Sequence, residues 1–92
     1  MARKLLRSAT PVAPADYEPA DVSAIQALSR GEADEHQQKR AMKWIIEQAA
    51  GTYEMHYYPT ERNTSFSLGR GFVGQQIVKM LRLNVSALTK GD

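Results

Sequence analysis

The sequence predicts an all-α protein in which an extended N-terminal arm precedes a short helix and an antiparallel helical hairpin. Three observations favour this fold. Residues 35–50 and 65–83 carry apolar side chains at the three- and four-residue spacing of a helix face. The stretch between them is too short to form a paired sheet by itself. Residues 1–19 contain three prolines and no sustained period, which is typical of extended chain.

The chain has 92 residues, which is enough for one domain. The part able to form a core, residues 20–84, is small, and domains of this size bury only roughly 60% of their unfolded surface. There is no cysteine, so disulfides and thiolate metal sites are excluded. The two histidines, His36 and His56, lie in different predicted elements and leave no metal-ligand spacing. We therefore expect no cofactor, and we expect other chains in an assembly to supply the missing stability.

Charge and hydropathy narrow the classes of partner. Twelve basic residues face ten acidic ones, and the net charge of +2 does not indicate a basic face for nucleic acid. No stretch approaches the roughly 18–20 apolar residues that a bilayer span requires. The first residues also lack the apolar core of a signal peptide. We expect a protein that is made in the cytoplasm and has no membrane partner.

The N-terminal arm, residues 1–19, is the first predicted element. In an isolated protein such a segment would be a flexible tail, whereas in an assembly it would lie along neighbouring subunits. Three charges bind DNA only weakly unless many copies act together, so we favour a protein partner for its basic start. The residues that we assign to this contact are Arg3, Lys4, Leu5, Leu6 and Arg7.

A short helix is predicted over residues 21–30. Val22 and Ile25 have helical spacing, Asp21 is the predicted N-cap, and Gly31 is the predicted stop.

The helix predicted over residues 35–50 has signals at both ends. Asp34 and Gln37 fit a capping box, and Gly51 stands where a left-handed residue would end the helix. Trp44 flanks its apolar stripe, and we expect this side chain to pack against another helix or at an interface. The stripe itself comprises Met42, Ile45, Ile46 and Ala49.

Residues 52–60 are rich in aromatic side chains and read as an extended connector. We expect Tyr57 and Tyr58 to lie against the helices or to bind another subunit. Asn63 or Thr64 then caps a helix over residues 65–83. Asn84 ends this helix, and residues 85–92 form a short C-terminal tail that we expect to fray. The apolar positions of the helix are Phe66, Leu68, Val73, Ile77, Met80 and Leu81.

Three glycines inside this last helix, Gly69, Gly71 and Gly74, match the letters of a dinucleotide-binding loop. That loop requires a preceding buried strand and an acidic residue about 20 positions later, and the sequence offers neither. Each glycine costs a helix about 0.8–1 kcal/mol relative to alanine. We therefore expect the missing side chains to permit close packing, with Gly71 and Gly74 on one face and Gly69 on another. One face would meet the Trp44 helix and the other a neighbouring chain. The alternative is that the glycines mark a kink or a helix start.

Arg70 lies within this glycine run, and its planar guanidinium can bridge two acceptors. We predict that it anchors a carboxylate, a phosphate or a carbonyl at an interface. His36 and His56 each have an acidic residue close by in the sequence, Glu35 and Glu54. Neither pair predicts acid-base catalysis, because no nucleophile or orienting group stands at a useful spacing.

Residues 38–83, about half the chain, resemble a family of small tailed-phage proteins, the Bbp-nineteen type, named after an open reading frame of a Bordetella phage. The resemblance rests on Ala41-Met42-x-Trp44-Ile45-Ile46 and on Thr64-x-Phe66-x-x-Gly69-Arg70-x-x-Val73-Gly74. Family members have a second arginine after Arg70, where this chain has Gly71. The resemblance implies a late, assembly-related phage protein, and it supplies no catalytic residues.

These observations predict a non-enzymatic virion protein, present in many copies, that binds capsid or portal and tail subunits through its helices and its arm. The alternative is a small-terminase-like packaging factor that binds DNA as a ring. An enzyme is not expected, because the chain is too small to form a cleft around an acid-base site.

Overall fold

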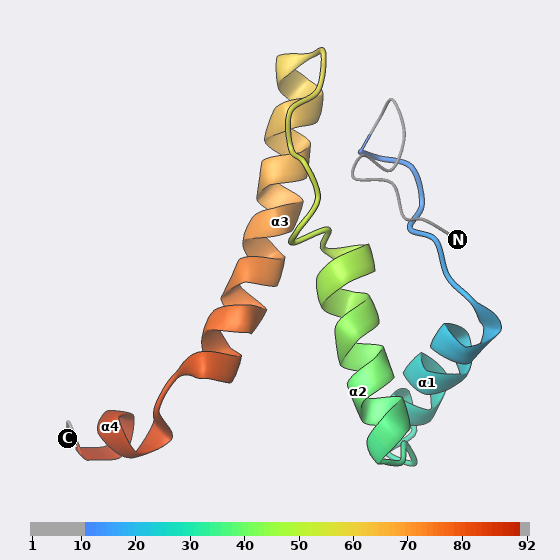
Figure 1. Cartoon of the computed structure of the whole chain (residues 1–92), viewed down its shortest axis with the longest axis vertical. Coiled ribbons are helices and arrows are strands. Elements are labelled where there is room, and N and C mark those ends of the chain that lie inside the picture. The colour runs from blue at the N-terminus through green and yellow to red at the C-terminus, as the bar shows by residue number, and fades with distance from the viewer. Residues whose placement is uncertain (1–10, 91–92) are drawn as a thin grey trace.

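The computed structural model of the chain describes residues 11–90 (Figure 1). Within this range it contains helices and no strand, which confirms the all-α fold class. The elements are α1 (Pro19–Ser29), α2 (Glu35–Trp44), the π-helical turn η1 (Ile45–Ala49), α3 (Glu61–Arg82) and α4 (Val85–Lys90).

Helix α1 packs on α2 through small side chains, and Ala24, Ala27 and Ala41 are buried between them. The helix begins earlier than predicted. Its N-cap is Glu18, whose backbone N–H donates to the Asp21 carboxylate at 2.8 Å. The prediction that Asp21 is the N-cap was therefore wrong. Pro19 occupies the first helical position, where the fixed φ of proline already matches that of a helix.

The predicted helix over residues 35–50 forms, with a wider last turn than expected. Asp34 caps it as predicted, accepting from the Gln37 N–H at 2.8 Å. Beyond Trp44 the chain follows π-helical geometry, and the Ala50 N–H reaches back to the Ile45 carbonyl at 2.9 Å. Gly51 then adopts a positive φ of 59°, and Gly31, the predicted stop of the first helix, has a φ of 73°.

Helix α3 also begins earlier than predicted. Thr60 is its N-cap and accepts from the Asn63 N–H at 3.2 Å, so neither Asn63 nor Thr64 has that role. The Thr64 hydroxyl instead bonds the backbone of Tyr58, accepting from its N–H at 2.9 Å and donating to its carbonyl at 3.2 Å. Residues 85–90 of the expected tail are helical, and the Asn84 side chain accepts from the Ala87 N–H at 3.3 Å.

Helices α2 and α3 run in opposite directions but diverge in a V (Figure 1). Helix α3 packs against η1 and the connector, not along α2. The buried apolar residues that result are few and mostly small: Ala24, Ala27, Ala41, Ile46 and Ala50. Little apolar surface is therefore removed from water inside the described part of the chain.

Candidate functional site

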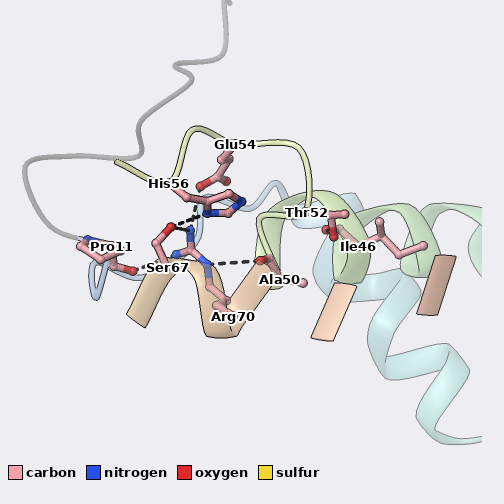
Figure 2. Close-up of polar contacts among 8 residues, drawn as sticks. All are labelled: Pro11, Ile46, Ala50, Thr52, Glu54, His56, Ser67 and Arg70. Atoms are coloured by element: carbon pink, nitrogen blue, oxygen red, sulfur yellow. Dashed lines mark hydrogen bonds and ion pairs between the residues drawn. The ribbon is translucent and has the colours of Figure 1, made fainter. Parts of the chain in front are cut away.

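Arg70 forms the centre of a polar cluster on the inner face of α3 (Figure 2). Its Nε donates to the Ala50 carbonyl at 3.2 Å, and its Nη1 donates to the Pro11 carbonyl at 2.9 Å. Its Nη2 forms an ion pair with Glu54 at 3.1 Å, and both side chains are only 11% exposed. One guanidinium thus joins α3 to the arm, to the end of η1 and to the connector.

Two further side chains complete this cluster. The Ser67 hydroxyl lies 2.6 Å from His56 Nδ1 and accepts from Arg70 Nη2 at 3.4 Å (Figure 2). A serine beside a histidine and a carboxylate has the residue types of a catalytic triad. Here Ser67 is fully buried, and the carboxylate of Glu54 binds Arg70. The arrangement suits an internal clamp, because the hydroxyl bonds both His56 and Arg70.

The predicted anchoring chemistry of Arg70 is present, since it binds a carboxylate and two carbonyls. The acceptors belong to its own chain, at sequence separations of 16, 20 and 59 residues. Its contact with a second protein stays a prediction.

The three helical glycines divide between two faces of α3. A Cβ on Gly71 would lie 2.8 Å from the His56 ring, and a Cβ on Gly74 would lie 2.9 Å from the Ala50 Cβ. A Cβ on Gly69 would meet nothing within 4 Å. Gly71 and Gly74 therefore permit close packing inside the chain, whereas Gly69 opens onto the surface.

Trp44, predicted to pack against another helix or at an interface, contributes to the position of the arm. Its indole N–H donates to the Asp16 carbonyl at 2.9 Å. Together with the bond from Arg70 to Pro11, this contact places the second half of the predicted arm, residues 11–18, against the chain's own helices. The assigned residues Arg3, Lys4, Leu5, Leu6 and Arg7 lie outside the described residues.

The two connector tyrosines differ in accessibility. Tyr57 is 83% exposed and free to meet another molecule. The Tyr58 hydroxyl is buried and has no hydrogen-bond partner within residues 11–90.

The outer face of α3 is the exposed face that carries Gly69, and the sequence predicted that one of the two glycine-bearing faces meets a neighbouring chain. We give this name to the stripe Phe66, Gly69, Phe72, Val73, Gln76 and Met80 of α3 together with its C-cap residue Leu83. Phe66 is 46% exposed, Val73 is 56% exposed and Met80 is 71% exposed. Phe66, Val73 and Met80, three of the predicted apolar positions of this helix, lie on this exposed face. The inward positions are instead taken by Ser67, Gly71 and Gly74, because the connector lies too close for larger residues.

A groove of about 480 Å³ opens between α2 and the second half of α3. Its apolar lining includes Met42, Ile46 and Leu81, and Lys43 and Arg82 stand among its polar residues. The groove is a direct consequence of the V between the two helices.

Some sites are absent from the described part of the chain. Residues 11–90 hold no cluster of histidine and carboxylate side chains suited to a metal ion. None of the helices described is long and apolar enough to cross a bilayer. Comparisons with protein-family models, with curated proteins and with solved structures found no match to this chain.

Proposed function

We propose that this chain is a phage virion structural protein that binds neighbouring capsid, portal or tail subunits and performs no catalysis. The observation that carries the proposal is the outer face of α3, where large apolar side chains lie in solvent while alanines occupy the interior. A soluble monomer rarely leaves an apolar patch of this kind uncovered unless the patch binds something.

The polar cluster of Arg70 supports a binding role in a second way. It holds Pro11 and the connector on the inner face of α3, and residues 11–90 leave the opposite face exposed. Packing of the described residues therefore does not compete with binding at the outer face. The fold behaves as a support that presents one helix to a partner.

The phage assignment rests on the resemblance at residues 38–83. Within its second motif, Thr64, Arg70 and Gly74 have clear tasks in the fold. Phe66 and Val73 lie on the outer face, where they are 46% and 56% exposed. Binding to another subunit would bury these two side chains and would give them a role in the interface.

Mass spectrometry of purified particles of the encoding phage tests this proposal. We expect the protein in mature particles, in multiple copies, at a constant ratio to the capsid protein. Its absence from mature particles, in lysates where the protein is produced, would overturn the proposal.

DNA packaging is the competing function, and the groove between α2 and α3 is the observation that favours it. Lys39, Lys43 and Arg82 line it, and basic side chains bind the phosphate backbone. A gel-shift titration with duplex DNA at increasing salt separates the two functions. A structural protein should shift the DNA little at any salt concentration, whereas tight binding that weakens steeply with salt would favour packaging.

A further inference from the structure

We propose that the outer face of α3 binds the same face of a second copy of this chain, with the two helices parallel and in register. The proposal names the partner of the surface on which the proposed function rests. It is argued from the spacing, chemistry, charge and area of that surface.

The spacing of the outer face is that of a coiled-coil seam. Phe66, Val73 and Met80 recur every seven residues, and Gly69, Gln76 and Leu83 follow each of them three positions later. Alternating steps of three and four keep one stripe directed at a partner helix. With 22 residues α3 is long enough for three such repeats. The intrachain contacts of Ser67, Gly71 and Gly74 lie on the opposite side of the helix.

Two seam positions favour an identical partner. Gln76 is exposed in the middle of the apolar stripe, and its side-chain amide holds both donors and an acceptor. Across a parallel two-fold axis it meets its own copy, so each amide can satisfy the other. A single polar residue within the seam can set the register of paired helices, as asparagine does at the first seam position of a coiled coil. At Gly69 the backbones can approach closely, because nothing lies within 4 Å of its Cβ position.

The charges along α3 permit this pairing. Between Phe66 and Leu83 no seam position is charged. Lys79 flanks the seam in the last turn of α3, and Arg70, towards the other edge of the seam, is paired with Glu54 inside its own chain. Arg62 follows the same stripe but stands in the first turn of α3, beside Glu61 and open to solvent.

The exposed area is about the least that a specific pair needs. The outer face contributes five large apolar side chains with exposed fractions between 40% and 71%. A fully exposed phenylalanine presents ~150–250 Å² and the aliphatic side chains present less, so roughly 500 Å² of apolar surface is available on each copy. Two copies would bury about 1,000 Å² in total, which reaches the lower limit for a specific interface.

The test uses the full chain and two variants of Gln76. Native mass spectrometry and sedimentation velocity of the wild type, over about 1–100 μM, should show a dimer whose fraction rises with concentration. Gln76→Glu and Gln76→Lys each place two like charges face to face. Each should weaken pairing by about tenfold or more, which corresponds to about 1.4 kcal/mol. An equimolar mixture of the two variants should form 1:1 heterodimers, because the opposed charges then attract.

Gln75→Glu is the matched control, since it adds the same charge to the neighbouring exposed residue outside the seam. It should pair as the wild type does. Recovery of pairing in the mixture separates loss of pairing from loss of folding. A wild type that stays monomeric, or a mixture without heterodimers, would overturn the proposal, and a monomer that copurifies with another phage protein would assign the face to that protein. A chain that pairs but is missing from particles would overturn the proposed function and leave this inference standing.

Discussion

Arg70 shows how much of this fold depends on a single side chain. Its guanidinium binds three segments that are distant in sequence, namely the arm at Pro11, the end of η1 at Ala50 and the connector at Glu54. With the bond to Ser67, four of the five N–H donors of the guanidinium are in use. Loss of the side chain would remove the cation that lies 3.1 Å from the buried carboxylate of Glu54.

We expect Arg70→Met to lower the free energy of unfolding by roughly 3 kcal/mol, because it removes one partner of a buried ion pair together with the bonds to two carbonyls. Adding Glu54→Gln to this variant should recover part of the loss, since the remaining group is then neutral. Urea unfolding of the two single variants and the double variant measures the coupling.

Arg30→Met provides the control for that cycle. Arg30 pairs with Glu32 at 2.8 Å, but the two side chains are 58% and 66% exposed, so its loss should cost below about 1 kcal/mol. Equal losses for Arg70→Met and Arg30→Met would show that the Arg70 cluster does not hold the fold together.

At the residue level, the sequence predicted most of the helix caps and stops, because these depend on residues close by in the chain. Asp34 as a cap and Gly31 and Gly51 as helix stops are confirmed, because each acts within a few residues of its own position. Asp21 was misassigned because Pro19 moved the helix start upstream. The acceptors of Arg70 were beyond prediction, because tertiary contacts alone bring Pro11 and Glu54 to it.

At the level of the element, α3 has two faces with different roles: one packs inside the chain and the other lies in solvent. Glycine and serine face the connector, and large apolar side chains face outward. The helix and the division of its glycines between two faces could be predicted from spacing alone. Which face lies inward could not, because apolar period normally marks the inward side. The close approach of residues 50–56 reversed that rule here.

We expect Gly74→Ala to destabilise the chain by roughly 2 kcal/mol, because overpacking exceeds the gain of about 1 kcal/mol in helix propensity. The added methyl would press on Thr52 and on the Ala50 Cβ, and Thr52 is already held by its 2.7 Å bond to the Ile46 carbonyl. Gly69→Ala is the matched control, and in dilute solution it should stabilise the chain by up to about 1 kcal/mol. Thermal and urea unfolding measure both changes. If Gly74→Ala raised stability as Gly69→Ala does, the inner face would not be tightly packed.

At the scale of the whole molecule, the described part of the chain buries few large apolar side chains and exposes many. Its inner contacts are alanines, one isoleucine and the polar cluster of Arg70, while α3 presents Phe66, Val73 and Met80 to solvent. Such a chain gains stability when a second polypeptide covers the outer face. Binding that favours only the folded state makes the melting temperature depend on protein concentration.

The most direct test of the account is therefore the melting temperature of the 92-residue chain. It is measured by circular dichroism across a hundredfold range of protein concentration that starts at about 1 μM. We predict that it rises steadily with concentration, and that Val73→Glu, which places a charge in the middle of the outer face, abolishes the rise. A cooperative transition at one fixed temperature, identical in dilute and concentrated solution, would contradict the account.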